Sequence, residues 1–574
     1  MAVLRASRVP RSSGAGEQIA VADRIEHIFR ALARSHVTGI LTDRGVTATL
    51  VGVVAIHDTG ERLLRWTYDG PPWTGETIFE IAGPLSLYRC ALEYTSELDG
   101  RLDTRLPAVL ERVRTRREQR VPVPPRVFVR MRTRSGLLIS RELHDVSHRG
   151  LAFAVAARDD ISVGAEIDGV VIDWQSRLRI CARLLVRHIS EESMEGRRTA
   201  GAVVIFDSPE DALHWDVEVE ALLEPATQTG GTWTRDLWEL FERSGYFSLS
   251  NKAPDNFARL RHAFVSVSRK LAHAPGAGIQ VVWPSGRGVE GSAAVVAIND
   301  QSVFMYQLGR RHGNPPVGVT GRAVVHGVFY RAIRWILTQR QFRWVVVWVQ
   351  EAGRFSKRLQ LDFVTRYADG QRASVVRFRA LEIPTSTAPH SEIRRVGTSP
   401  PPRPKAAEQW TLSKARRAEL ERVGNAASAV FPPSFVAAHA IGVPGEEHSE
   451  EAGDALRRGR EVVVATFDGA IQAAAILEWT EDGVHLYGLL DVMRVVPMGP
   501  SAEAAVPVLV EHARQRYASI GKAAFVFAAD ADLAVDRWPE GATDLGVTYC
   551  TVLSVELLPE LADHSWELAH GAHD

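Results

Sequence analysis

Two short segments indicate the fold of this chain: Arg116-Arg117-Glu118-Gln119-Arg120 and Asp145-Val146-Ser147-His148-Arg149-Gly150. The first contains an Arg-x-x-x-Arg pair, and the second precedes an apolar segment over 151–156 with the composition of a strand. Guanidinium groups bind phosphate through paired hydrogen bonds and stack on purine rings. Asp and Ser exchange hydrogen bonds with a base edge, and glycine permits close backbone approach. This combination suits a compact, anionic purine ligand.

The two segments together resemble the signature of the PilZ domain, a bacterial receptor module for cyclic di-GMP. In that family an Arg-x-x-x-Arg pair lies on a linker that leads into a small β-barrel, and an Asp/Asn-x-Ser-x-x-Gly motif follows on the barrel. The resemblance implies cyclic di-GMP as the ligand and a set of ligand-binding residues: Arg116, Arg117, Arg120, Asp145, Ser147 and Gly150. The alternative is a solvated basic linker before an ordinary hairpin turn.

Strand-like segments at short spacing surround these motifs. They predict a PilZ domain over 112–225 with a six-stranded β-barrel and a closing helix over 209–223. Before it, residues 18–111 combine one amphipathic helix, over 22–35, with several alternating strands. This β-rich module resembles the N-terminal partner domain of flagellar-brake-type PilZ proteins.

Length and composition limit the class of protein. A chain of 574 residues exceeds one hydrophobic core and implies roughly three to five domains. A net charge of -1 provides no overall field that attracts nucleic acid, so we expect no nucleic-acid partner. The 3 cysteines lack metal-type spacing, and no run of about 18 apolar residues occurs. We therefore expect a cytoplasmic protein with no metal site and no membrane span.

The second half of the chain contains an apparent repeat. Residues 233–383 and 410–560 each begin with helices and continue with strands, a helix and a further strand, and a Pro-rich linker over 384–409 separates them. In this alignment Ser302–Gly309 matches Gly483–Leu490 as the third strand of each half. The order resembles the GNAT acyltransferase fold, in the tandem arrangement of Fem-type aminoacyl transferases and N-acyl amino acid synthases. The predicted class is thus multidomain α+β: a β-rich module, a PilZ barrel and two tandem GNAT-like α/β units.

The GNAT resemblance implies acyl-CoA as a cofactor, bound through a glycine-rich loop at a helix N-terminus. The loops at the matching places contain Pro315, Pro316 and Pro500, which lack N–H donors. Tyr306 and Tyr487 are candidates for a general acid, with half-buried strand tyrosines as the alternative. No catalytic residue is assigned, and acyltransferase activity stays open.

Several other patterns favour structural roles. Arg310, Arg311 and His312 either meet a pyrophosphate or form a solvated turn. His144 and His148 are four residues apart but flank a strand end, which disfavours a metal site. The Gly-x-Gly-x-x-Gly motif over 286–291 continues into a strand instead of a helix, and it therefore indicates a hairpin turn and not a dinucleotide site.

Three functions follow from the sequence. The first is a cyclic di-GMP receptor that regulates a non-catalytic acyltransferase-like output, which acts on a protein partner; its variant is an active acyl-CoA-dependent N-acyltransferase under the same control. The second is an enzyme whose PilZ-like barrel no longer binds a nucleotide. The third is a basic module that binds RNA or DNA, which the near-neutral charge disfavours.

Overall fold

The computed structural model describes residues 17–20, 22–34, 38–41, 46–55, 62–68, 76–82, 86–98, 101–114, 120–133, 135–175, 178–190, 198–249, 252, 254–273, 276–313, 315–316, 319–339, 341–386, 410–444, 456–533 and 538–570. The chain divides into two compact units. The first comprises Met1–Gln228 and Ala562–Asp574, and the second comprises Thr229–Leu561.

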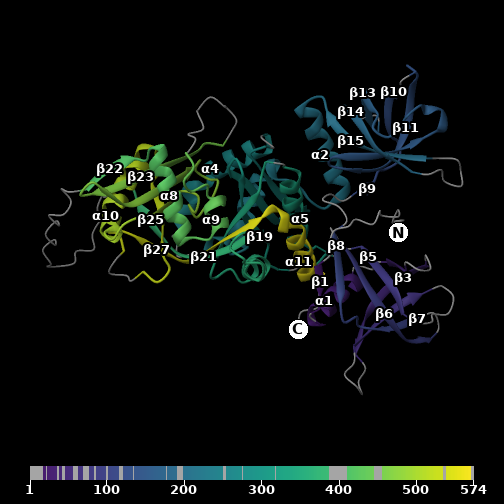
Figure 1. Ribbon diagram of the computed structural model, residues 1–574, viewed down its shortest axis with the longest axis horizontal. Helices are drawn as coiled ribbons and strands as arrows, with labels where there is room; N and C mark the ends of the chain where they lie inside the picture. Colours follow the sequence, from purple (N-terminus) through teal and green to yellow (C-terminus); the bar gives the residue numbers. More distant parts are fainter. Residues whose placement is uncertain are drawn as a thin grey trace. The chain divides into compact units, whose positions relative to one another are not determined.

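The first sheet of the first unit closes on itself (Figure 1). Its strands run in the order β1-β8-β6-β5-β2-β3-β4-β7, and β7 also pairs with β6 to complete a ring. Helix α1 (Ala22–Arg34) buries Ile25, Ile28, Phe29 and Leu32 in the core of this sheet, with the three-to-four-residue spacing of an amphipathic helix. The strands are β1 (Glu17–Ile19), β2 (Thr38–Leu41), β3 (Val46–Ala55), β4 (Arg62–Tyr68), β5 (Glu76–Ala82), β6 (Ser86–Leu98), β7 (Arg101–Arg105) and β8 (Leu110–Arg114).

The end of the chain contributes to this same core. From Ala562 onward, helix α11 (Leu558–His570) belongs to the first unit, and its Trp566 packs with the residues around α1. Asp563 forms a buried ion pair with Arg112 of β8, with 3.6 Å between Oδ2 and Nη1. The strand that leads into the arginine segment is therefore held by the last helix of the chain.

The second sheet forms the predicted six-stranded barrel. The order is β10-β13-β14-β15-β12-β11, closed by pairing of β10 with β11, and β9 adds to the edge of β11. Helix α2 (Pro209–Leu223) starts at Ser208, whose hydroxyl accepts from the Asp211 N–H, and Pro209 fits the first turn. The strands are β9 (Val121–Pro122), β10 (Val127–Arg132), β11 (Leu138–Ser147), β12 (Gly150–Val155), β13 (Glu166–Trp174), β14 (Leu178–Ile189) and β15 (Arg198–Phe206).

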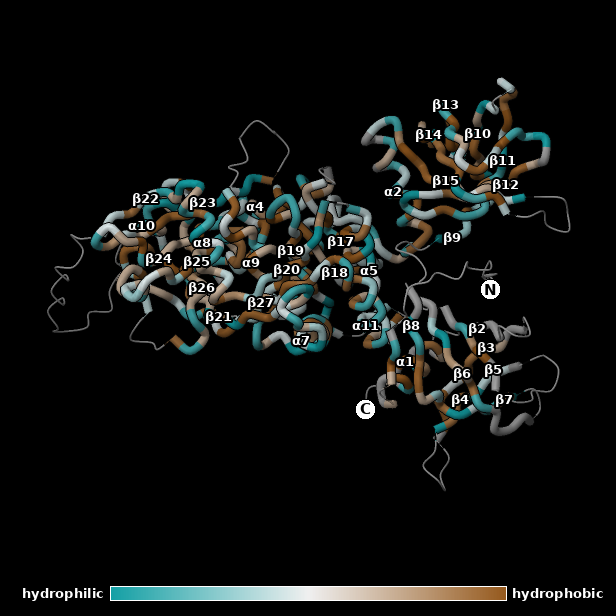
Figure 2. Tube along the Cα trace, in the orientation of Figure 1, coloured by the Kyte–Doolittle hydropathy of each residue, from teal (hydrophilic) through white to brown (hydrophobic). Residues whose placement is uncertain are grey.

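The described strands of the second unit form one sheet in the order β16-β17-β18-β19-β20-β27-β21-β26-β25-β24-β23-β22. Figure 2 shows hydrophobic stretches along these strands. The strands are β16 (Gln228–Thr229), β17 (Gly278–Ser285), β18 (Gly288–Asn299), β19 (Ser302–Arg310), β20 (Trp344–Gln350), β21 (Ala373–Pro384), β22 (Trp410–Lys414), β23 (Arg458–Phe467), β24 (Ala470–Thr480), β25 (Val492–Pro497), β26 (Ala524–Asp530) and β27 (Thr543–Ser554). The helices are α3 (Thr234–Arg243), α4 (Pro254–His273), α5 (Gly321–Thr338), α6 (Arg354–Ser356), α7 (Asp362–Arg366), α8 (Arg417–Val430), α9 (Pro433–Ala438) and α10 (Ala502–Ser519).

The two halves of this unit exchange their last strands. The strand β21 of the first half pairs with β26 of the second, while β27 of the second half pairs with β20 of the first. The exchanged strands also pair with each other over Ala373–Glu382. Each half contains one parallel pair, β19 with β20 and β25 with β26, joined through α5 and α10. The predicted α+β class with a six-stranded barrel is thus confirmed, and the predicted GNAT-like stretches 233–383 and 410–560 share a single sheet.

The predicted third strand of the second half is wrong. Gly483–Leu490 forms successive turns, and β25 takes the place of that strand. Gly483 and Gly488 have φ of 89° and 72°, a left-handed conformation that glycine tolerates. A methyl group at Gly483 would lie 2.3 Å from the Phe264 nitrogen of α4, so close approach of the two backbones requires glycine. Tyr487 therefore has no strand position equivalent to that of Tyr306.

Candidate functional site

The second motif lies at the tight turn between β11 and β12. Ser147 pairs with Gly150 across this turn, and Asp145 lies two residues before it on β11. Arg120 comes from the segment just before β9, which pairs with β11 at Asp145 and Val146. The structure therefore brings together Arg120, Asp145, Ser147 and Gly150. Arg116 and Arg117 lie outside the described residues.

Arg120 and Asp145 form the charged part of the site. The Arg120 Nη1 donates to Asp145 Oδ1 at 2.7 Å, and about a third of each side chain is exposed (31% and 33%). An exposed pair of this kind contributes little stability, about 0–1 kcal/mol, so it is readily exchanged for another partner. A guanidinium binds the O6 and N7 acceptors of guanine, while a carboxylate accepts from its N–H donors. This pair can thus serve a guanine base.

Two glycines provide room for the guanidinium. A methyl group at Gly150 would lie 3.7 Å from Arg120 Nη2 and 3.0 Å from the Ala202 carbonyl oxygen. A methyl group at Gly201, on the neighbouring strand β15, would lie 3.8 Å from the same nitrogen. Larger side chains at either position would occupy the space beside Arg120. Gly201 was not predicted as a site residue, because it belongs to no motif.

The turn is fixed from behind by helix α2. Trp215 is fully buried, and its Nε1 donates to the carbonyl oxygens of Ser147 at 3.0 Å and His148 at 3.1 Å. His148 is 7% exposed, and its ring nitrogens lie 3.0 Å from Asp216 Oδ1 and 2.7 Å from Glu220 Oε1. Burial opposes the charge on this ring, but the two carboxylates outweigh burial and raise the pKa of His148 to about 9. A charged His148 therefore braces the turn, a role that sequence reasoning missed.

The two histidines of the motif region do not converge. His144 lies 3.3 Å from Thr199 Oγ1, whereas His148 binds carboxylates of α2. Among the described residues no group of three His, Cys, Asp or Glu side chains is arranged to hold a metal ion. Within the same described part of the chain, every helix is too short or too polar to cross a bilayer.

The candidate residues of the second unit make structural contacts. Tyr306 is buried, and burial raises its pKa; Tyr487 donates its hydroxyl to the Tyr246 carbonyl, and burial also raises its pKa. Arg311 is 7% exposed and donates to the Val289 carbonyl at 3.1 Å and to Glu239 at 3.3 Å. It therefore belongs to the interior and is not part of a solvated turn.

At the two helix starts where the resemblance places an acyl-CoA pyrophosphate, backbone N–H donors already bind acceptors of the protein itself. The Ala323 N–H of α5 donates to Thr320 Oγ1 at 3.1 Å, and the Ser501 N–H before α10 donates to Gln472 Oε1 at 3.1 Å. A pyrophosphate would have to displace these acceptors. Acyl-CoA binding stays a prediction.

No protein-family model matches the chain, and no curated protein matches it significantly. Among solved structures, the chain is similar to Klebsiella pneumoniae MrkH in complex with c-di-GMP: 16% identity, 37% of this chain, 98% of that chain and a TM-score of 0.31. Escherichia coli YcgR in complex with c-di-GMP is 13% identical, over 35% of this chain and 89% of that chain, with a TM-score of 0.28. A probable N-acyltransferase of Enterococcus faecalis V583 is 11% identical, over 58% of this chain and 72% of that chain, with a TM-score of 0.25. The first unit of this chain is PilZ-like in its two motifs and in its closed six-stranded barrel.

Proposed function

We propose that the barrel and the arginine segment before it form a receptor for cyclic di-GMP. The observation that carries this proposal is the position of Arg120, which lies beside Gly150 and Gly201 and pairs with Asp145 across the two motifs. Two motifs that are 25 residues apart between Arg120 and Asp145 thus converge on one surface of the barrel. Arg116 and Arg117 precede this surface by a few residues and complete the proposed site with Ser147 and Gly150.

In the proposed mechanism the nucleotide replaces an internal ion pair. Arg120 leaves Asp145 and binds a guanine edge or phosphate, while Asp145 accepts from guanine N–H groups. The anionic phosphates also offset repulsion among the arginines of the segment. Each hydrogen bond to a charged group contributes about 1.5–3 kcal/mol, so loss of one arginine should be measurable.

The test is calorimetric titration of the full chain with cyclic di-GMP. We expect Arg116→Ala and Arg120→Ala each to weaken binding at least tenfold, which corresponds to about 1.4 kcal/mol. Arg183→Ala is the matched control, because this exposed arginine of β14 pairs only with Glu166 in the hydrogen-bond and ion-pair geometry described. Unchanged affinity in both motif variants would exclude the arginine segment from the site.

We further propose that nucleotide binding regulates the second unit and that this unit is a non-catalytic output that binds a protein partner. The occupied helix starts at Thr320 and Ser501 support this version over acyl-CoA chemistry. Incubation of the protein with acetyl-CoA or palmitoyl-CoA, with and without cyclic di-GMP, should release no thiol above the blank. Hydrogen exchange in the second unit should change when the nucleotide is added.

Nucleotide-dependent thiol release would instead establish the alternative, an active N-acyltransferase controlled by cyclic di-GMP. Unchanged hydrogen exchange throughout the second unit, in protein saturated with nucleotide, would contradict regulation. Arg120→Ala provides the control for both measurements, because it should abolish any nucleotide effect at concentrations that saturate the unmodified chain.

A further inference from the structure

A cavity of about 480 Å³ lies within the second unit, where both of its halves provide the lining. The first half contributes Phe304, Val346 and Trp348 from β19 and β20, and the second half contributes β23, β24, β25 and the α9 segment. This volume falls in the range of small-molecule sites, which combine apolar walls with a few placed polar groups. The site belongs to neither motif discussed above.

Two arginines supply the polar part of the cavity. Arg494 is 2% exposed, pairs with Glu478 through Nη1, and lies 5.6 Å from the ring centre of Trp348. Arg460 donates from Nη1 to the Ala440 carbonyl at 2.7 Å, and its Nε lies 4.0 Å from Glu478 Oε1. The Arg494 Nε and the Arg460 Nε and Nη2 have no hydrogen-bond partner among the described residues. Buried donors without a partner are costly, so they favour an acceptor supplied by a ligand.

His439 adds a third donor to the cavity wall. It is 3% exposed, its Nε2 lies 3.6 Å from Cys550 Sγ, and its Nδ1 has no hydrogen-bond partner among the described residues. Burial and the charges of Arg494 and Arg460 lower the pKa of His439, while burial raises the pKa of Cys550 to about 12. A protonated thiol beside Nε2 places the imidazole proton on Nδ1, which lies 4.0 Å from Glu478 Oε2.

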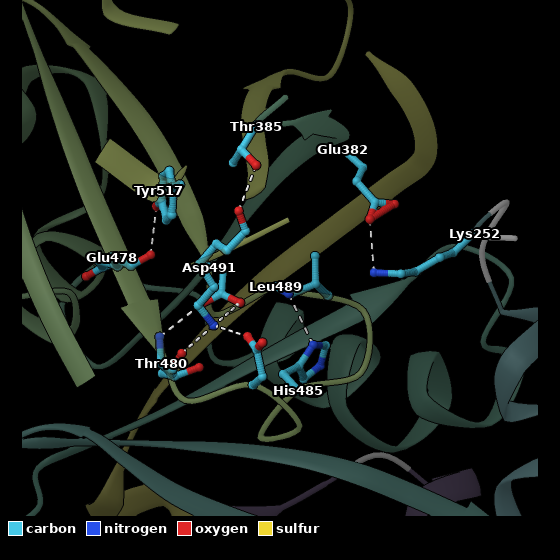
Figure 3. A network of polar contacts seen from close by, with 11 residues as sticks. Lys252, Glu382, Thr385, Glu478, Thr480, His485, Leu489, Asp491 and Tyr517 are labelled. Atoms are coloured by element: carbon cyan, nitrogen blue, oxygen red, sulfur yellow. Dashed lines mark hydrogen bonds and ion pairs between the residues drawn. The ribbon is translucent and has the colours of Figure 1, made fainter. Parts of the chain in front are cut away.

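The charge of this cluster selects the class of ligand. Two arginines and Glu478 leave one excess positive charge beside a neutral histidine, and the rim pair of Arg458 with Asp300 adds none. The Tyr517 hydroxyl donates to the backbone carbonyl oxygen of Glu478 at 2.8 Å (Figure 3), while the Glu478 carboxylate pairs with Arg494. A monoanion neutralises the excess charge, whereas a dianion would leave a second buried charge without a partner.

We propose that this cavity binds a small monocarboxylate with an apolar body, the carboxylate between Arg460 and Arg494 and the body against Phe304, Val346 and Trp348. A carboxylate accepts two parallel hydrogen bonds from a guanidinium, and the apolar body replaces water at the aromatic and aliphatic walls. The binding step does not depend on cyclic di-GMP.

Cys550, His439 and Glu478 lie next to one another in space, as a cysteine, a histidine and a carboxylate do in some nucleophilic enzymes. Their geometry disfavours covalent catalysis. Cys550 is fully buried and does not line the cavity, and its thiol stays protonated. Glu478 pairs with Arg494 and lies 4.0 Å from His439 Nδ1. The three groups are therefore not arranged to activate a nucleophile.

Ligand-observed NMR on the full chain tests the proposal. The probes are 3-phenylpropionate and straight-chain carboxylates from butanoate to octanoate, each with its neutral amide, together with phenyl phosphate. We expect at least one carboxylate to bind at least tenfold more tightly than its amide and more tightly than phenyl phosphate. Arg460→Gln should weaken that binding at least tenfold.

Two further variants separate binding from folding. Val443 lines the mouth of the cavity and is 53% exposed, so Val443→Trp should block binding without disturbing the core. Arg377→Gln, at an exposed arginine of β21 outside the cavity, should leave binding unchanged. The proposal is overturned if no carboxylate binds, if amides bind equally, if phenyl phosphate binds more tightly, or if both cavity variants retain the unmodified affinity.

Discussion

At the scale of single residues, the candidate nucleotide site depends on a charge that the motif does not reveal. His148 is buried between Asp216 and Glu220 of α2, and these carboxylates raise its pKa to about 9 from an ordinary value of 6.5. The folded state therefore binds a proton more tightly than the unfolded state. The resulting stabilisation is fully present below about pH 6.5 and is lost as the pH rises through 9, with a size of about 3 kcal/mol.

We expect the free energy of unfolding of the barrel to fall by this amount between pH 6 and pH 9.5, and His148→Gln to remove most of the dependence. Urea denaturation at several pH values measures it. His188→Gln is the control, because His188 is an exposed histidine of β14. A pH profile that is the same in the unmodified chain and in His148→Gln would show that the charge of His148 does not stabilise the fold.

The same residues show how far the sequence reaches at this scale. The resemblance to the PilZ signature predicted that Arg120, Asp145, Ser147 and Gly150 belong to one site, and the structure places these four residues close together. The contacts of α2 that support this turn were not predictable, because Trp215, Asp216 and Glu220 lie on a helix that follows the barrel in the sequence. Only folding of α2 against the turn brings them to His148.

At the scale of elements, alternation of apolar and polar residues predicted strands, and this prediction failed at Gly483–Leu490, where close packing of the backbone determines the conformation. Gly483–Leu490 alternates like a strand, but Gly483 packs on the backbone of α4 and Gly488 turns the chain. Neither contact leaves a signal in the local sequence. Lys522, which follows α10 in the sequence, then fixes these turns, because it donates to the Thr480 carbonyl at 2.5 Å, Asp482 at 2.5 Å and Asp491 at 3.0 Å. Thr480 and Asp491 are labelled in Figure 3.

Loss of this lysine should cost far more than loss of a surface lysine. Lys522 is 8% exposed, and Lys522→Met would leave Asp491 buried without its countercharge, at a cost of about 3–5 kcal/mol. Lys270→Met is the matched control, because Lys270 binds Glu481 of the same turns but is 27% exposed, and its loss should cost about 1 kcal/mol. Thermal and urea unfolding of the second unit distinguish the two. Equal destabilisation by both substitutions would contradict the assigned role of Lys522.

At the scale of the whole molecule, the repeat of the second half was predictable but its strand exchange was not. The folded sheet shows that β21 pairs with β26 of the second half and that β27 pairs with β20 of the first half. Because the central pairs cross between halves, neither half can complete its sheet alone. The second unit should therefore unfold as one cooperative body.

This expectation is testable with two matched core substitutions, one in each half. Val346 of β20 and Val526 of β26 are 0% and 1% exposed, so Val346→Ala and Val526→Ala should each destabilise the unit by about 2 kcal/mol. Since the exchanged strands link both sites, each substitution should speed amide hydrogen exchange in β20 and in β26 by a similar factor. Val430→Ala, at a residue that is 51% exposed on α8, should leave both rates nearly unchanged. Faster exchange confined to the substituted half would mean that the halves open independently despite their shared sheet.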